Sequence, residues 1–162
     1  KANAVWIYRG MDTSSPPRLF FDEQIPPMGS AIDFTVNQND LYLLHNDSHI
    51  SFCEFSLMIS SPTRCEDPAN FTDPRLGRQS GSKIEGAVFS EIQFSPPPEP
   101  SIYTLDPVAK AIYRLSLKLT YNQQYRPLES LSKGNATSFT INKSNRTVFL
   151  AMGNQIFYAA LP

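Results

Sequence analysis

A pattern of two short strands joined by a polar turn occurs three times in this chain of 162 residues. Each copy starts with a run of aromatic and branched residues, passes through a turn rich in Gly, Pro, Asn, Asp or Ser, and enters a second such run. The copies cover residues 40–44 with 50–55, 102–106 with 111–117, and 147–151 with 155–161. Because they recur at roughly 45 to 60 residues, the pattern predicts a chain of repeated sheets of similar size.

The remaining segments also favour an all-β chain. No segment shows the sustained apolar spacing of an amphipathic helix, and the fourteen prolines interrupt most windows. The alternation of Ile32, Phe34 and Val36 predicts a half-buried strand, whereas the dense run 41–44 predicts a strand covered on both faces. Further strands are expected at residues 4–9, 18–22, 48–55, 87–94, 101–105, 110–118, 121–127, 136–141, 147–152 and 155–161.

Two internal matches suggest a family. Residues 31–37 align with residues 136–142 as the opening strand of two repeats, and 102–106 with 111–115 form a typical repeat pair. On these segments the chain resembles the β-propeller repeat families of the NHL, YVTN and WD-like kind, without the Gly-His or Trp-Asp dipeptides of the WD type. The resemblance implies blades of four-stranded antiparallel sheets, about three and a half in this chain. Their portions would be residues 1–27, 28–86, 87–134 and 135–162.

The blade count has a consequence for partners. Propellers close with about four to eight blades, so this resemblance implies the C-terminal part of a larger propeller or partner chains that complete the ring. The last blade lacks an obvious fourth strand, which in such propellers commonly comes from the other end of the chain. The sequence starts at Lys1 without an initiator Met or signal peptide, which indicates a processed product or an excised portion. A membrane anchor upstream would be compatible with this.

Cysteines and sequons point outside the cytoplasm. Cys53 and Cys65 suit a disulfide across a hairpin, with two buried free thiols as the alternative. Five Asn-x-Ser/Thr sequons lie in predicted turns or loops, where unmodified turn formers are the alternative. They begin at Asn46, Asn70, Asn135, Asn142 and Asn145. We therefore expect a disulfide-bonded glycoprotein that is secreted, periplasmic or exposed at the cell surface.

Charge and hydropathy argue against a nucleic-acid surface and against a membrane-spanning helix within this sequence. The net charge is −1, and no basic stripe with interleaved aromatic residues occurs, which argues against a nucleic-acid surface. No apolar run reaches the roughly 18 residues that a membrane-spanning helix needs.

No constellation of catalytic or metal-binding residues is evident. His45 and His49 have the i, i+4 spacing with which two histidines on one face of a helix bind the same metal. Here they flank a turn, so a plain polar turn is favoured. Aspartates at strand ends or turns most often bind backbone N–H groups; these are Asp33, Asp40, Asp47 and Asp106. A Gly-x-Ser-x-Gly elbow and a phosphate-binding glycine loop are both absent. We expect no catalytic residue, no metal and no cofactor.

The best candidate for recognition is the polar segment 61–85, rich in Pro, Gly, Asp and Arg. Loops on a rigid β scaffold commonly carry binding surfaces, and Arg is frequent at interface hot spots. The candidate binding residues are Arg64, Arg75, Arg78 and Lys83. The alternative is a solvated insertion between blades. The segment 96–100 is expected to be a stiff connector, or else a ligand for an aromatic groove.

Taken together, these features predict a non-catalytic, extracytoplasmic propeller module. It would bind a protein partner as an interaction, sensor or scaffold surface, for example as an accessory subunit of a membrane-associated complex. One alternative is a propeller enzyme of lyase, hydrolase or dehydrogenase type, whose central channel would use Asp33, Glu91 and Gln93. Another is a structural subunit that polymerises through open sheet edges.

Overall fold

The described part of the chain is built almost entirely from β-strands. The structure is a computed structural model that describes residues 5–7, 16–21, 25–55, 63–127 and 134–161. Within these ranges it contains four antiparallel sheets and one 3-10 turn, η1 (Met28–Ser30). The predicted all-β class is therefore confirmed. Among the described residues, no helix has the length and apolar character needed to cross a membrane.

Three of the sheets are meanders, in which each strand pairs with the next one along the chain. Sheet one contains β3 (Ala31–Asn37), β4 (Asp40–His45), β5 (Ile50–Glu54) and β6 (Arg64–Glu66). Sheet two contains β7 (Glu91–Ser95), β8 (Ser101–Asp106), β9 (Ala111–Leu115) and β10 (Tyr121–Tyr125). Sheet three contains β11 (Ser138–Asn142), β12 (Thr147–Met152) and β13 (Gln155–Ala160). The fourth sheet is the short pair β1 (Trp6–Ile7) and β2 (Arg18–Leu19).

Some predicted strands are shorter than expected. The strand predicted over 87–94 begins only at Glu91. Its first residues belong instead to a turn in which the Ala87 N–H donates to the Ile84 carbonyl (3.2 Å), and this turn buries Ile84 among apolar side chains. In the predicted pair 4–9 and 18–22, residues 4, 8, 9 and 22 lie outside the described residues.

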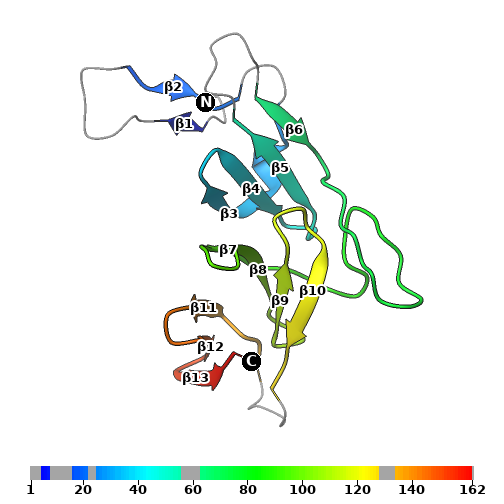
Figure 1. The fold of residues 1–162 in the computed structure, drawn as a ribbon, viewed down its shortest axis with the longest axis vertical. Helices are drawn as coiled ribbons and strands as arrows, with labels where there is room; N and C mark the ends of the chain where they lie inside the picture. The colour runs from blue at the N-terminus through cyan, green and yellow to red at the C-terminus, as the bar shows by residue number, and fades with distance from the viewer. Residues whose placement is uncertain (1–4, 8–15, 22–24, 56–62, 128–133, 162) are drawn as a thin grey trace.

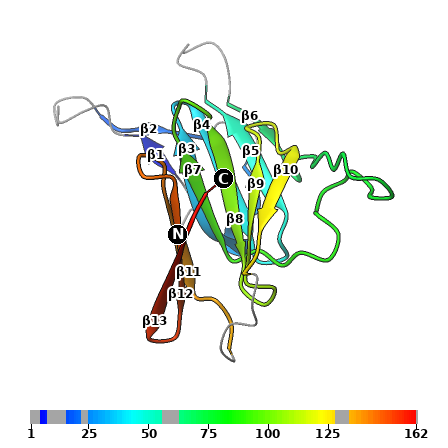
Figure 2. The same cartoon turned by 60° about the horizontal axis from the view of Figure 1, so that its bottom comes forward.

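The first strands of the three meanders lie side by side. In Figure 1, β3, β7 and β11 follow one another, and the later strands of sheets one and two lie progressively farther from them. Figure 2 shows the same sheets from a second direction, with sheet three again beside sheet two. The sheets thus meet face to face along a row formed by their first strands.

Polar side chains of β3 bind the backbone of β7. The Ile92 N–H donates to the Asp33 carboxylate (2.8 Å), and the Phe94 N–H donates to the Thr35 hydroxyl (2.9 Å). The N–H groups of a first strand would otherwise lack partners on the side that faces the neighbouring sheet. These two bonds therefore fix sheet two against sheet one in one register.

The same arrangement recurs between β7 and β11. The Phe139 N–H donates to the Glu91 carboxylate (3.1 Å), and the Gln93 side-chain amide donates to the Phe139 carbonyl (2.7 Å). In both junctions the polar residues of one first strand contact the following first strand, while its apolar residues point the other way.

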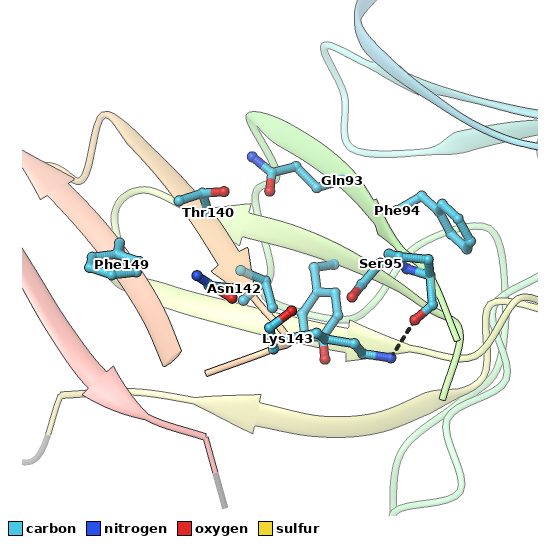
Figure 3. Close-up of a pocket in the computed structure, with 11 residues that line it drawn as sticks. Gln93, Phe94, Ser95, Thr140, Asn142, Lys143 and Phe149 are labelled. Atoms are coloured by element: carbon cyan, nitrogen blue, oxygen red, sulfur yellow. Dashed lines mark hydrogen bonds between the residues drawn. The ribbon is translucent and has the colours of Figure 1, made fainter. Parts of the chain in front are cut away.

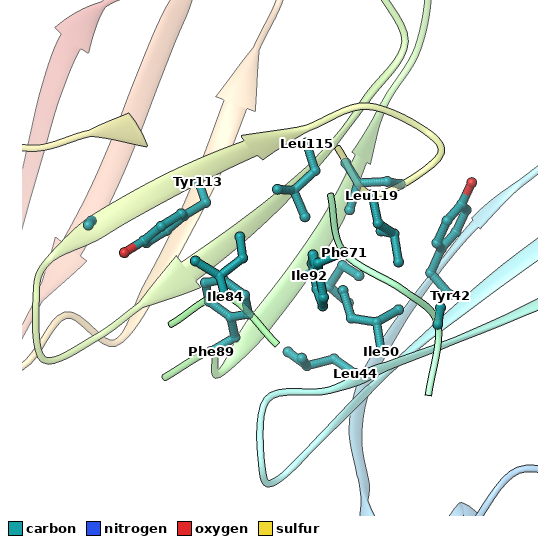
Figure 4. Close-up of a cluster of buried hydrophobic side chains, with 13 residues drawn as sticks. Tyr42, Leu44, Ile50, Phe71, Ile84, Phe89, Ile92, Tyr113, Leu115 and Leu119 are labelled. Carbon is teal, nitrogen blue, oxygen red and sulfur yellow. The ribbon is translucent and has the colours of Figure 1, made fainter. Parts of the chain in front are cut away.

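Apolar clusters fill the spaces between the sheets. Between sheets one and two, Tyr42, Leu44 and Ile50 of sheet one share a single buried cluster with Ile92 and Tyr113 of sheet two, and each of these residues is at most 4% exposed (Figure 4). Burial of this kind contributes roughly 1.5–3 kcal/mol per large side chain. A second cluster joins sheets two and three; its buried members are Tyr103, Leu105, Ile112, Ala136, Phe139, Val148, Leu150 and Met152.

The predictions for the first two strands of sheet one have different outcomes. All four residues of the run 41–44 are buried, as expected for a strand covered on both faces. In β3 the alternation is present, but its apolar side is open. Ile32, Phe34 and Val36 are 46% to 62% exposed, because the β1–β2 pair covers only a more distant part of that face. The strand thus alternates as predicted, but its apolar side is the more exposed one and its polar side faces sheet two.

Cys53 and Cys65 form a disulfide, as predicted. They stand directly opposite each other in β5 and β6, with Cα atoms 4.1 Å apart. The bond ties the three-residue edge strand β6 to the sheet, close to the buried side chain of Phe55.

We predict that this disulfide stabilises the chain by about 3 kcal/mol, the value that loop-closure entropy gives for a sequence separation of this size. Adding a reductant should lower the urea midpoint of the wild-type chain to that of the Cys53→Ala/Cys65→Ala variant. The variant itself should not respond to the reductant. A wild-type midpoint that is unchanged on reduction would contradict this assignment.

A second prediction concerns the junction between β3 and β7. Asp33→Ala should lower the free energy of unfolding by about 1–2 kcal/mol, because the Ile92 N–H loses a charged acceptor. Hydrogen exchange of the Ile92 amide, monitored by NMR, should be faster in this variant than in the wild-type chain. Asp40→Asn is the matched control. Burial and the opposing Glu54 raise the pKa of Asp40, so removal of its charge should not destabilise the chain.

Candidate functional site

The segment between β6 and β7, residues 67–90, is called the connecting loop here. It projects from the sheets at the side opposite β3 and β7 (Figure 1). Its base is part of the core, since Phe71 and Ile84 are 1% and 3% exposed. Phe71 also exchanges two backbone hydrogen bonds with Gly81 (2.6 and 3.0 Å). The loop is therefore anchored at its base and exposed only toward its tip. Residues 61 and 62 of the predicted recognition segment lie outside the described residues.

The four predicted binding cations do not converge on one patch. Arg64 lies on β6, opposite Glu54, and is exposed. The other three belong to ion pairs, which are Arg75–Asp73 (2.6 Å), Arg78–Glu85 (2.9 Å) and Lys83–Asp47 (2.8 Å).

Arg75 clamps the loop onto sheet two. Its guanidinium donates to both carboxylate oxygens of Asp73 (2.8 and 2.6 Å) and lies 3.9 Å above the ring of Tyr121 in β10. The hydrogen bonds from Arg75 hold the pKa of the largely buried Asp73 carboxyl below its usual range. A bidentate pair that also stacks on an aromatic ring is well ordered. Arg75 is thus a positioning residue for the loop.

The tip that this clamp supports presents an apolar side chain to solvent. Leu76 is fully exposed, and Gly77 follows it with φ +77°, a conformation that favours glycine. The turn is closed by the Arg78 N–H, which donates to the Arg75 carbonyl (3.1 Å). An exposed leucine beside an exposed arginine, on a loop with a rigid base, is suited to anchoring a protein partner.

A buried hydrogen-bond network lies below the loop. His45 is fully buried, with Nδ1 at 2.8 Å from the Ser30 hydroxyl and Nε2 at 2.7 Å from the Ser51 hydroxyl. Ser51 in turn donates to the Asp67 carboxylate (2.6 Å). Because Ser51 gives its proton to Asp67, His45 carries a proton on Nε2 and donates it to Ser51. The Ser30 hydroxyl proton has two acceptors at 2.8 Å, Nδ1 of His45 and the Pro27 carbonyl. Burial, followed by the nearby charge of His49, lowers the pKa of His45.

His49 continues the network to the surface. Its Nδ1 lies 2.5 Å from Asp47 and its Nε2 lies 3.1 Å from Asp67, so both nitrogens face carboxylate oxygens. Asp47 also pairs with Lys83 of the connecting loop, whose hydrogen bond is the main cause of a lowered pKa at Asp47. The network therefore ties the turn after β4 to the connecting loop at two places, its first residue Asp67 and Lys83.

Three of these residues have side chains of the kind that bind metals. The ligand atoms of His45, His49 and Asp67 all lie within 4.8 Å of one another. However, the two imidazole rings are stacked 4.0 Å apart and nearly parallel (10°), so their in-plane lone pairs run parallel instead of converging. A transition metal at about 2.1 Å from both nitrogens would require one ring to rotate. The arrangement favours a hydrogen-bond network, and the predicted absence of a metal stays a prediction.

A pocket of about 460 Å³ lies beside the ends of β7 and β11 (Figure 3). Polar side chains such as Gln93, Thr140 and Asn142 line it. Lys143 donates to the carbonyls of Pro96 (2.9 Å) and Glu99, and burial lowers its pKa. This lysine therefore holds the predicted Pro-rich connector in place.

The first-strand residues that the sequence offers to an enzyme already have structural roles. The carboxylates of Asp33 and Glu91 accept backbone N–H groups of the next strand, and the Gln93 amide donates to a carbonyl there. Along the described first strands, these polar groups thus serve the junctions between sheets.

The predicted glycosylation sites are all accessible. The side chains of Asn46, Asn70, Asn135, Asn142 and Asn145 are exposed. Their glycosylation stays a prediction.

Sequence reasoning missed Ser30, Ser51 and Asp67 as members of the histidine network. Ser51 and Asp67 are 16 residues apart, and only the pairing of β5 with β6 brings them together. The one local signal was the His45/His49 pair.

By its fold and contacts, this is an all-β chain built from repeated antiparallel meanders that are joined along their first strands. Comparison of the chain with family models, with curated proteins and with solved structures finds no match.

The buried histidine predicts a pH dependence of stability. Because the folded chain lowers the pKa of His45 below its usual 6.5, the unfolded chain binds this proton more readily. Burial of the neutral His45 ring therefore costs no stability above pH 6.5, where the ring is also neutral in the unfolded chain. Below that pH the unfolded chain takes up the proton first, and the free energy of unfolding falls. Wild-type unfolding free energy, measured with urea between neutral and mildly acidic pH, should decline with a slope of up to about 1.4 kcal/mol per pH unit from this group.

His45→Gln should remove that component of the slope, whatever its effect on stability at neutral pH. His49→Gln is the comparison variant: it removes the lesser cause of the lowered His45 pKa and keeps the buried ring, so most of the slope should remain. An identical pH slope in wild type and His45→Gln would show that His45 is not the group involved.

Proposed function

We propose that this chain is part of a β-propeller. The observation that carries this proposal is the repeated junction, in which β3, β7 and β11 lie side by side and polar residues of each bind the next. Radially arranged four-stranded meanders with adjacent first strands are the plan of propeller blades. Sheets one and two are two such blades, and sheet three provides three strands of another.

We further propose that the module acts by binding a protein partner and not by catalysis. The polar residues of the first strands are engaged in sheet junctions, and the histidine network is closed by its own hydrogen bonds. The tip of the connecting loop, by contrast, presents Leu76 and Arg78 on an anchored base. The disulfide between Cys53 and Cys65 is compatible with a location outside the cytoplasm. A sensor, a scaffold or an accessory subunit would use such a surface.

The loop tip can be tested without damage to the fold. Deletion of the loop would remove Phe71 and Ile84 from the core, so a single photocrosslinking residue at position 76 is the better probe. In the native host we expect irradiation to yield one discrete adduct, identified by mass spectrometry. Arg78→Glu should reduce its yield several-fold, because the charge at the edge of the contact is reversed.

Val108 provides the matched control position. It is also exposed (66%), but it lies in the turn between β8 and β9. The same adduct from positions 76 and 108, or no adduct at position 76, would contradict a binding role of the loop tip.

A further inference from the structure

One face of sheet three is exposed to solvent, whereas the equivalent faces of sheets one and two are covered by the next sheet. On β13, Ile156 and Tyr158 are 72% and 77% exposed and stand beside Ala151 and Phe149 of β12. The Phe149 and Tyr158 rings contact each other at 6.3 Å. Ser138 and Thr140 of β11 lie on the same side and are exposed.

Strand register gives the equivalent residues in the other sheets. Thr35, Gln93 and Thr140 pair with Tyr42, Tyr103 and Phe149 respectively, so these positions correspond. Continuing across each sheet in the same way makes Ile50, Ile112 and Ile156 equivalent.

The exposure of these equivalents differs sharply. Ile50 and Ile112 are 0% and 3% exposed because the next sheet covers them, whereas Ile156 is 72% exposed. Sheet three therefore has the residues of a sheet junction, including an isoleucine at the same position, but no sheet against it in the described residues. An exposed patch of this kind marks a surface that another molecule or segment covers.

Sheet one shows the complementary situation on its opposite face. Phe34 is equivalent to Ile92 and Phe139, which insert into the preceding sheet and are 2% and 3% exposed. Phe34 itself is 62% exposed. A hollow of about 510 Å³ remains between β3 and the β1–β2 pair, lined by Phe34, Val36 and Leu41 among others.

From these equivalences we propose that both open faces are docking sites for a further antiparallel sheet built like sheets one to three. On sheet three, the Thr140 hydroxyl accepts a backbone N–H group of the incoming first strand, as that of its equivalent Thr35 does for β7. The Ser138 hydroxyl already donates to the Glu91 carboxylate (3.1 Å) and is not needed for this role. On sheet one, Phe34 inserts into the last face of a preceding sheet. This proposal rests on the propeller arrangement and is independent of the partner that the loop tip binds.

The occupant follows from continuity with the two junctions inside the chain. Each junction joins a face with polar first-strand residues to a face with apolar ones, always in the same order along the chain. The two open faces are one of each kind, so the face of sheet three matches the face of sheet one. A second copy of this chain, associating head to tail, is therefore the proposed occupant of both faces.

The test measures head-to-tail association by analytical ultracentrifugation. The wild-type chain should associate in a concentration-dependent manner. Ile156→Lys and Phe34→Lys each place a charge on one open face and should weaken association by at least about tenfold. Both side chains are exposed in the single chain, so the substitutions should leave its fold intact. Leu76→Lys, at the loop tip, is the control and should associate like wild type.

A mixture of the two variants is the decisive sample. Ile156→Lys keeps the open face of sheet one, and Phe34→Lys keeps that of sheet three, so together they should form a one-to-one dimer that neither forms alone. A chain that stays monomeric at all concentrations, or a mixture that stays monomeric, would overturn the proposal. Association that is unchanged in both single variants would overturn it as well. A negative crosslinking result at position 76 would leave this test unaffected.

Discussion

The structure depends on how the first strand of each meander contacts the sheets on its two sides, with hydrogen bonds to one and apolar packing against the other. A strand at the edge of a sheet has unpaired backbone groups, which are costly when an adjoining sheet excludes water. The alternation of polar and apolar residues in the first strands solves this. Asp33 of β3 and Glu91 of β7 accept N–H groups of the next first strand, while Ile92 of β7 and Phe139 of β11 fill apolar space on the preceding side. One strand thereby specifies both the spacing and the register of the sheets.

Other features follow from this row of junctions. Since successive sheets meet face to face, the second strands must be apolar on both sides, and the run 41–44 in β4 is buried on both. The connecting loop crosses the junction between sheets one and two, so Phe71 and Ile84 join its core while Arg75 fixes the loop to β10. The histidine network then secures the base of the loop to the turn after β4 through Asp47 and Lys83. A loop held at so many points can display its tip without losing its shape.

Much of the fold could be predicted from the sequence, and less of the site. The strand pairs and the Cys53–Cys65 disulfide were predictable because they depend on local alternation and short spacing. The open face of β3 was not, since alternation shows that two sides differ but not which side is covered. The network around Ser51 and Asp67 forms only after β5 and β6 have paired. Likewise, the cations at positions 75, 78 and 83 were recognisable as a group, but their separate carboxylate partners depend on how the loop folds.

The role of the first strands can be measured directly in solution by NMR of the isotopically labelled chain. We expect nuclear Overhauser contacts from the Ile92 amide proton to the Asp33 side chain and from the Phe139 amide proton to the Glu91 side chain, the pairs now separated by 2.8 and 3.1 Å. Contacts at both pairs, together with those within each sheet, would establish that the sheets are joined through their first strands. Intact contacts within the sheets with neither pair observed would contradict it.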